Sequence, residues 1–222
     1  LQSNPVPWGT PQSNTYQLSG GINYKYFVNP HIGFRFGASL IRITGADSLS
    51  DVTTNRLRNL SFHNNLFETS GAIELNFLPI DRESRFKFTP YIFAGLGAVF
   101  SNPYAFNDAG DKIKIRDLGT EGQGLANYPD RKLYPVVNAA FPLGGGFKFL
   151  VGDHVMISTE LGLRYTSTDY LDDVSRSYVN MDTLLAYRGQ QAVEMSYRGN
   201  TLREWENVYP NYTHQRGDFN KN

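Results

Sequence analysis

Apolar and polar residues alternate with a period of two over most of residues 16–166, which is the pattern of β-strands whose two faces meet different surroundings. In the first run, 16–28, Tyr24 and Tyr26 share one face and Lys25 lies on the other. Further runs of this kind follow at 32–40, 67–77, 141–151 and 155–166. The run at 88–100 is apolar on both faces, so the sequence does not orient it. Six strands are therefore predicted, and the fold class is expected to be all-β.

The segments between these runs are alternately short and long. Short segments lie at 29–31, 79–86 and 152–154, and long polar segments at 44–65, 101–135 and 167–222. Strands of about ten residues, with short turns on one rim and long loops on the other, are typical of bacterial transmembrane β-barrels. We therefore predict a transmembrane antiparallel up-and-down β-barrel with short periplasmic turns and long extracellular loops.

The number of strands leads to a further expectation. Bacterial barrels have an even number of strands, about eight or more, because an open sheet edge cannot lie in lipid. The first and the last predicted strands both border the long-loop side. We therefore expect eight strands, with one before Leu1 and one after Asn222, and we assign residues 1–222 to a single outer-membrane barrel domain.

The predicted strands also indicate which charged residues face the barrel interior and which aromatic residues lie near the two rims. The face that would line the barrel interior carries seven charged residues: Lys25, Arg35, Glu68, Glu74, Lys148, Glu160 and Arg164. The interior of an eight-stranded barrel is only wide enough for side chains, so we expect a salt-bridged network without a pore. Aromatic residues gather near strand ends, as interfacial girdles do. Tyr24, Tyr26, Phe77, Phe88, Phe147 and Phe149 approach the short-turn rim, and Tyr16, Phe100, Tyr134 and Tyr165 approach the long-loop rim.

Composition narrows the classes of function. The 222 residues contain 21 basic and 21 acidic side chains, so no net charge attracts nucleic acid, and we expect no nucleic-acid partner. The sequence has no cysteine, which excludes disulfides and thiolate metal sites within it. Its four histidines lie in turns, a long loop and the C-terminal segment, without a G-x-S-x-G or H-E-x-x-H motif. We therefore expect no catalytic site, no metal and no cofactor.

Four segments of the long loops have ordinary structural interpretations. The glycine-rich segment 119–124 lacks the Walker lysine, so we interpret it as a turn-rich surface loop rather than a phosphate site. Asp169, Asp172 and Asp173 offer oxygen ligands to calcium, but their spacing is not that of an EF-hand, and turn capping explains them as well. Residues 216–218 spell the adhesion tripeptide Arg-Gly-Asp, which we interpret as a turn. Loosely helical periodicity at 180–197 predicts short helices over the long-loop rim.

Seven strings of residues form a distinctive set that runs in order over most of the chain. They are RNLSF (58–62), FTPYIFAGLG (88–97), LGTEGQG (118–124), YPDRKLY (128–134), TDYLDDVS (168–175), YRGQQAVEMSYRG (187–199) and QRGD (215–218). Together they resemble the PorG-like outer-membrane barrels of Bacteroidetes, a family associated with the type IX secretion system. The family pattern also has a strand before the position of Leu1 and another after that of Asn222.

This resemblance implies a structural, non-catalytic role. The barrel would be integral to the outer membrane, surrounded by outer-membrane lipid, and would anchor a periplasmic ring formed by a PorK-like lipoprotein and a PorN-like protein. On this hypothesis the short periplasmic turns carry the partner contacts: Asn29, Pro30, His31, Asp81, Arg82, Glu83, Arg85, Asp153 and His154.

Two other interpretations remain open. The first is a small outer-membrane barrel whose long loops, above all 101–135 and 167–222, bind an extracellular ligand or surface without any secretion partner. The second is a soluble ligand-binding barrel with its apolar faces turned inward and its charged faces outward. The aromatic residues near the strand ends and the length of the alternating strands argue against the second.

Overall fold

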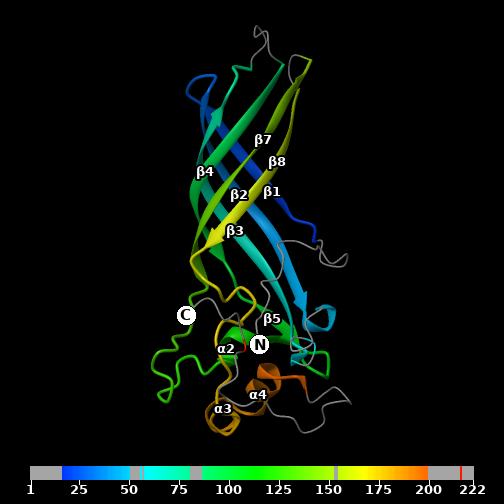
Figure 1. The fold of residues 1–222 in the computed structure, drawn as a ribbon, viewed down its shortest axis with the longest axis vertical. Coiled ribbons are helices and arrows are strands. Elements are labelled where there is room, and N and C mark those ends of the chain that lie inside the picture. The colour runs from blue at the N-terminus through cyan, green and yellow to red at the C-terminus, as the bar shows by residue number, and fades with distance from the viewer. Residues whose placement is uncertain are drawn as a thin grey trace, which may run out of the picture.

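The protein is mostly antiparallel β-sheet, curled into a half-barrel of eight strands with a few short helices at one end (Figure 1). The computed structural model describes residues 17–50, 56, 58–80, 87–152, 155–199 and 216. Six long strands pair in the order β1 (Gly20–Phe27), β2 (Ile32–Ala46), β3 (Ser61–Asn76), β4 (Phe88–Phe100), β7 (Val137–Val151) and β8 (Val155–Thr166). The remaining two, β5 (Tyr104–Phe106) and β6 (Lys112–Lys114), form a hairpin attached to β3 through the pairing of His63 with Tyr104.

The helices all lie at the end of the sheet where the long loops are (Figure 1). They are the 3₁₀ helix η1 (Asp47–Leu49) and the α-helices α2 (Ile115–Leu118), α3 (Met181–Arg188) and α4 (Gln190–Ser196). The helices predicted within 180–197 are confirmed as α3 and α4, which Gly189 separates at a φ of 84°. No helix in the described part of the chain is long and apolar enough to cross a membrane.

The sheet curls so strongly that strands far apart in its order meet across its concave face. Arg35 on β2 forms an ion pair with Glu160 on β8, although three strands lie between β2 and β8 in the sheet. Within the described residues, β1 and β8 each pair with one neighbouring strand, so they form the two edges of the half-barrel.

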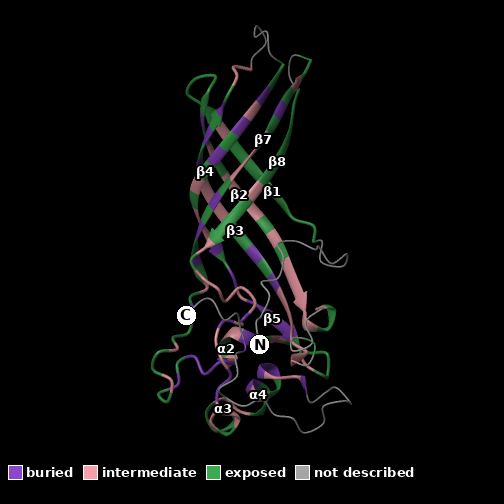
Figure 2. Ribbon diagram, viewed as in Figure 1, coloured by how far each residue is buried: buried purple, intermediate pink, exposed green. Residues whose placement is uncertain are grey.

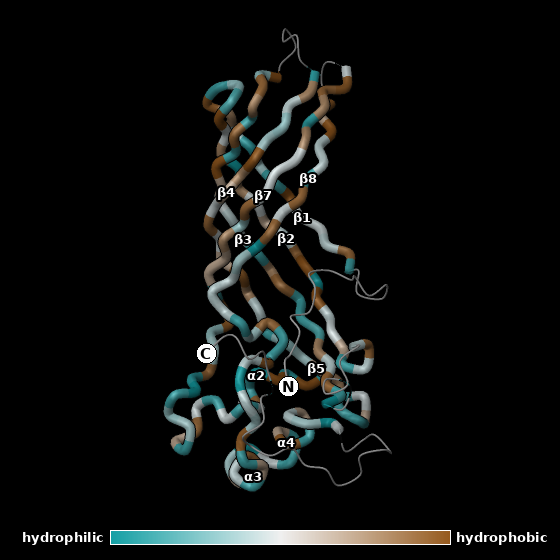
Figure 3. The backbone as a smooth tube through the Cα atoms, in the orientation of Figure 1, coloured by the Kyte–Doolittle hydropathy of each residue, from teal (hydrophilic) through white to brown (hydrophobic). Residues whose placement is uncertain are grey.

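Side chains alternate between the two faces of the curled sheet as the sequence predicts. Leu96 is 67% exposed and Leu161 is 79% exposed on the convex face, whereas Glu74 and Lys148 are each only 1% exposed on the concave face. Figure 2 shows buried and exposed segments alternating along the long strands, and Figure 3 shows the matching alternation in hydropathy. The charged residues of these strands are therefore on the concave face, and most of their large apolar residues are exposed on the convex face.

The structure orients β4, which the sequence could not. Tyr91 and Phe93 are buried on the concave face, while the intervening Ile92 is exposed. Phe93 pairs in register with Gly144 of β7, and a Cβ built on that glycine would lie 2.8 Å from Cζ of the Phe93 ring. The glycine therefore makes room for the aromatic ring that packs across it.

The strand boundaries differ from the predicted ones, mostly at the long-loop end. The first strand begins at Gly20 rather than at residue 16, whereas β3 begins at Ser61, six residues before the predicted run. Likewise, β2 continues to Ala46, β7 begins at Val137, and β5, β6 and α2 lie within a segment predicted as loop. In the extension of β2 the pattern inverts, because Ile41 and Ile43 pack inward against Leu66 while Arg42 is exposed, so the apolar face of the predicted run does not continue. The described total of eight comprises the six predicted strands and the two short strands of the β5–β6 hairpin.

The close approach of β7 to β8 leaves no room for a side chain at Gly146, which can be tested by substitution. A Cβ at this position would lie 1.9 Å from the backbone oxygen of Thr159, whereas a Cβ at Gly20 would meet nothing within 4 Å. We expect Gly146→Ala to lower the free energy of unfolding by about 2 kcal/mol or more, and Gly20→Ala to change it by less than about 0.5 kcal/mol. Urea unfolding followed by circular dichroism measures both, and equal effects of the two variants would contradict this close contact.

Candidate functional site

The concave face brings together all seven charged residues that the sequence assigns to the interior. We call them the concave-face network: Lys25, Arg35, Glu68, Glu74, Lys148, Glu160 and Arg164. Each takes part in at least one ion pair with another member of the set. The alternation of the strands positions them, because every member occupies a concave-facing position of its strand.

Glu74 on β3 is the centre of this network. Its Oε2 lies 2.9 Å from Nζ of Lys25 on β1 and 3.6 Å from a guanidinium nitrogen of Arg35 on β2. Its Oε1 accepts a hydrogen bond from Lys148 on β7, whose Nζ also donates to Oδ1 of Asn76 at 2.7 Å. One buried carboxylate therefore forms ion pairs with cations from three other strands, and Glu160 supplies a second negative charge to Arg35.

Arg35 extends the network to the far edge of the sheet. Its guanidinium donates to Oε2 of Glu160 at 2.8 Å and lies 4.2 Å from the centre of the Phe93 ring. The hydroxyl of Tyr91 donates to the same Glu160 oxygen at 2.8 Å. The sequence missed Tyr91 and Phe93 because both faces of their strand are apolar, so periodicity gave no sign of which side chains point inward.

A second ion pair lies nearer the long-loop end. Nε of Arg164 on β8 donates to both carboxylate oxygens of Glu68 on β3, at 2.9 and 3.1 Å. Between this pair and the pair of Arg35 with Glu160 lies a polar cavity of about 80 Å³. The concave face is thus filled largely by side chains, with space for a few water molecules.

The predicted partner-contact residues can be located only in part. Asn29, Pro30 and His31 form the turn between β1 and β2, where Oδ1 of Asn29 accepts hydrogen bonds from the amides of His31 and Ile32 at 2.9 and 2.8 Å. Asn76 donates from Nδ2 to the carbonyl of Pro30 at 3.1 Å, which ties the turn to the end of β3. The other predicted contacts lie outside the described residues: Asp81, Arg82, Glu83, Arg85, Asp153 and His154.

The long loops fold together at the opposite end of the sheet. We call the described residues of 101–136 and 167–199, with Arg216, the loop cap. Its core is the carboxylate of Glu121, which is fully buried and accepts hydrogen bonds from the amides of Ser175 and Arg176. Glu121 also forms an ion pair with the guanidinium of Arg216 at 3.2 Å. Arg216 in turn donates to the carbonyl of Asp173 at 2.8 Å, so a single guanidinium joins three parts of the chain.

Two buried carboxyl groups next to this ion pair have raised pKa values. Asp173 accepts hydrogen bonds from the hydroxyls of Thr120 at 2.5 Å and Tyr134 at 2.7 Å. Burial nevertheless raises the pKa of Asp173 to about 6, and it raises the pKa of the neighbouring Asp172 to about 6 as well. The cap therefore holds two carboxyls that exchange protons at a pH about two units higher than exposed aspartates do.

Two sequence interpretations of the long loops are wrong. The segment 119–124 is not a surface loop, because Glu121 and Gln123 are fully buried. The side chain of Arg216 is only 3% exposed and anchors the cap, while the other two residues of the Arg-Gly-Asp string lie outside the described residues. Tyr134 belongs to the cap and not to a girdle, since it is buried and its ring stacks on Tyr170 at 4.7 Å. Glycines at positive φ let the chain turn tightly enough to bury these polar groups. Such turns produce no repeating pattern of polar and apolar residues, so the sequence analysis could not detect the burial.

The aspartates that could have held calcium are distributed among hydrogen bonds within the cap. Asp169 accepts from the hydroxyl of Ser175, and Asp172 from the amide of Val174. In the described part of the chain, no three histidine, cysteine, aspartate or glutamate side chains come together in an arrangement that could hold a metal ion.

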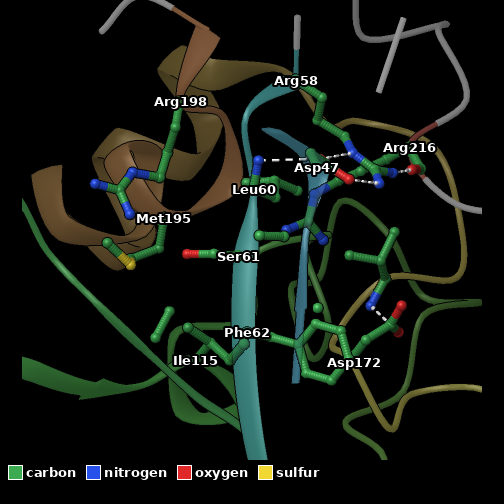
Figure 4. Close-up of a pocket in the computed structure, with 14 residues that line it drawn as sticks. Asp47, Arg58, Leu60, Ser61, Phe62, Ile115, Asp172, Met195, Arg198 and Arg216 are labelled. Carbon is green, nitrogen blue, oxygen red and sulfur yellow. Dashed lines mark hydrogen bonds and ion pairs between the residues drawn. The ribbon is translucent and has the colours of Figure 1, made fainter. Parts of the chain in front are cut away.

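A pocket of about 120 Å³ opens between the cap and the ends of β2 and β3 (Figure 4). Asp47 and Arg58 form a two-pronged ion pair on one side of it, with distances of 2.6 and 2.7 Å. Met195 and Ile115 supply apolar surface on another side. Arg58 also donates to the carbonyl of Arg216, which connects the pocket to the core of the cap.

The comparison with models of protein families identifies the family of this chain. A family model described as "Domain of unknown function (DUF6089)" matches residues 9–189. The chain belongs to this DUF6089 family. The comparisons with curated proteins and with solved structures gave no match. The DUF6089 match covers every described strand and α3, whereas α4 and Arg216 lie beyond it.

The centre of the network offers a sharp test of its energetics. Glu74→Gln would leave the ammonium of Lys148, whose side chain is 2% exposed, without its buried counter-charge. We expect the free energy of unfolding to fall by about 3–5 kcal/mol for this variant. Glu68→Gln is the matched control, since its partner Arg164 is 42% exposed, and we expect a loss of about 1 kcal/mol or less.

Adding Lys148→Met to Glu74→Gln should restore part of the lost stability, because the double variant no longer buries an unpaired ammonium. Urea unfolding curves of the three variants measure these differences. A Glu74→Gln protein as stable as the Glu68→Gln protein would contradict the central role of Glu74.

The two cap carboxyls should make the cap depend on pH. Because folding raises the pKa of Asp172 and Asp173, their stabilising effect is complete below about pH 4 and is lost as the pH rises through about 6. We expect amide hydrogen exchange at 119–125, corrected for intrinsic rates, to show protection that falls by roughly 3 kcal/mol per carboxyl across this range. Asp173→Asn should remove about half of this dependence, and exposed Asp182→Asn should leave it unchanged. An unaltered pH profile in Asp173→Asn would contradict the assignment.

Proposed function

We propose that the curled sheet, completed by further strands at its β1 and β8 edges, is a closed β-barrel in the bacterial outer membrane. We further propose that this barrel has a non-catalytic role in the type IX secretion system. There it anchors a periplasmic ring formed by a PorK-like lipoprotein and a PorN-like protein.

The observation that carries the membrane proposal is the inverted distribution of polar and apolar side chains. Apolar residues of all six long strands stand exposed on the convex face, among them Ile22, Phe36, Ile73, Leu96, Phe141 and Leu161. The charged residues of the same strands are paired on the concave face. In water this arrangement would leave a large apolar surface exposed, whereas in lipid it places each group in a suitable environment.

The dimensions of the strands support the same proposal. The strands β2, β3, β4, β7 and β8 contain 12 to 16 residues each. A tilted strand needs about 9–11 residues to cross the hydrocarbon core, so these strands are long enough to span it and reach beyond. Closure is required on this proposal, because backbone groups at an open edge have no hydrogen-bonding partner in lipid.

The secretion role is supported by the resemblance of the seven strings to PorG-like barrels. The turn of Asn29, Pro30 and His31 suits a protein contact, because it is exposed and internally hydrogen-bonded. A preorganised turn loses little conformational freedom when it binds. We propose that this turn and the segments 81–85 and 153–154, which the sequence analysis predicts to be short periplasmic turns, meet the periplasmic ring.

Co-purification from detergent-solubilised native membranes tests this function. The tagged wild-type protein should resist alkaline extraction from membranes and should retain stoichiometric ring proteins. Reversing four charges with Asp81→Lys, Arg82→Glu, Glu83→Lys and Arg85→Glu should reduce the retained ring proteins by about tenfold or more, because complementary charges across an interface become like charges.

The matched control reverses an exposed ion pair on the opposite rim, Arg176→Glu with Asp130→Lys, and should leave the ring proteins in place. Full retention by the quadruple variant would remove the 81–85 turn from the contact. A wild-type protein that brings down no periplasmic partner would overturn the anchoring role.

A second function, binding of a small extracellular ligand by the cap, is favoured by the pocket beside Asp47 and Arg58. Its combination of apolar and charged walls is typical of sites that orient a small molecule. The same co-purification separates the two functions, since a barrel that serves only as a receptor would be recovered without periplasmic proteins.

A further inference from the structure

The convex face changes character near its long-loop end. On β2 and β3, the outward pair of Leu40 with Phe67 is 65% and 40% exposed and belongs to the apolar surface. The next outward pair toward the long loops is Arg42 with Asn65, where Nε of Arg42 donates to Oδ1 of Asn65 at 3.1 Å. The pair after that contains His63. Apolar residues thus give way to polar and basic ones within one step along the strands.

The β5–β6 hairpin widens this polar region. Its one face buries Ala105 and Ile113 against Met195 in the cap. The alternate residues Tyr104 and Phe106 lie on the other face, beside the ring of His63, at centroid distances of 5.4 and 5.5 Å. Their register partners in β6 are Lys114 and Lys112 respectively.

We call the surface made by Arg42, His63, Phe106, Lys112 and Lys114, with the buried Tyr104 beneath it, the basic-aromatic patch. Nζ of Lys112 lies 3.8 Å from the centre of the Tyr104 ring, so the ring fixes the position of this ammonium. Backbone pairing from β2 through β3 and β5 to β6 joins the patch into one continuous ladder.

The positive charges of the patch have no carboxylate partner among the described residues. The ion pairs there include neither Arg42, Lys112 nor Lys114. In the hairpin turn Asp108 pairs with Arg198, and Asp111 accepts a hydrogen bond from the neutral side chain of Asn107, so the charge of Asp111 offsets at most one of the three positive charges. The patch therefore presents an excess of positive charge directly above an apolar surface.

We propose that the basic-aromatic patch binds the phosphate of a lipid headgroup in the outer leaflet of the outer membrane. This inference rests on the proposed membrane function, which puts the apolar surface in the acyl region and the patch at headgroup level. Aromatic rings favour that level, and guanidinium and ammonium groups bind phosphate oxygens by charge-assisted hydrogen bonds. The patch thus fits a phosphorylated lipid that touches the apolar surface with its chains and the cations with its headgroup.

Binding of lipid A to the purified protein in zwitterionic detergent tests the proposal. We expect Arg42→Gln combined with Lys112→Gln to raise the Kd about tenfold or more, because two charge-assisted contacts are lost. Arg42→Lys combined with Lys112→Arg, which keeps both charges, should restore most of the affinity. Lys132→Gln combined with Arg176→Gln removes two cap charges outside the patch and should change the Kd less than about twofold.

Three further outcomes would overturn the proposal. One is equal binding of lipid A and its dephosphorylated form, and another is an unchanged Kd in the Arg42 and Lys112 double variant. The third is binding of inorganic phosphate as tight as that of lipid A, which would indicate a soluble anion instead of a lipid.

Insertion into pure phosphatidylcholine vesicles, followed by alkaline washing, tests the underlying membrane function separately. If the wild-type protein inserts there but binds lipid A and its dephosphorylated form equally, only the proposed lipid binding by the patch is overturned. A protein that does not insert overturns the membrane function on which the patch depends.

Discussion

The ion pairs of Glu74 are the interactions that connect the strands of the curled sheet across its concave face. A buried carboxylate is stable only when cations and hydrogen-bond donors surround it, and Glu74 draws these from three strands, through Lys25, Arg35 and Lys148. A flat sheet would separate these groups, because β1 and β7 lie on opposite sides of β3, each two strands away. Curling the sheet brings them together and at the same time leaves apolar side chains of all six long strands on the convex face. The ion pairs on the concave face and the apolar surface on the convex face therefore both result from the curling of the alternating strands.

The loop cap repeats this principle with different partners. Glu121 is buried among backbone amides and the guanidinium of Arg216, as Glu74 is buried among side-chain cations. Arg58, Glu121, Asp173 and Arg216 come from four of the strings that resemble PorG-like barrels, and the structure gathers them at the long-loop end. The strings on which the resemblance rests thus include residues that hold the cap together. The turn at 29–31, one of the proposed ring contacts, lies at the opposite end of the sheet, so it depends on other residues.

The sequence predicts the strands well because their alternation is local. A two-residue period identifies the face of Lys25 or Arg164 from the immediate neighbours alone. It does not say which charges pair, because the pairing of Arg35 with Glu160 depends on how far the sheet curls. It also fails for Tyr91, where both faces are apolar, and for Glu121 and Arg216, which meet across 95 positions of the chain. Prediction from the sequence is therefore reliable for strand faces and unreliable for the cap, whose contacts have no period.

The position of Arg216 has a consequence for the order of folding. Its carbonyl meets Arg58 across 158 positions, and every one of the six long strands except β1 and β2 lies between them in the sequence. Bringing such distant residues together in an unpaired chain carries a large entropic cost, which falls when the intervening strands are already paired. The cap is therefore expected to close last, on a sheet that has already formed. A chain whose strands pair out of register would hold Arg58 and Arg216 apart and leave its loops open, so closure of the cap distinguishes a correctly assembled sheet from a misassembled one.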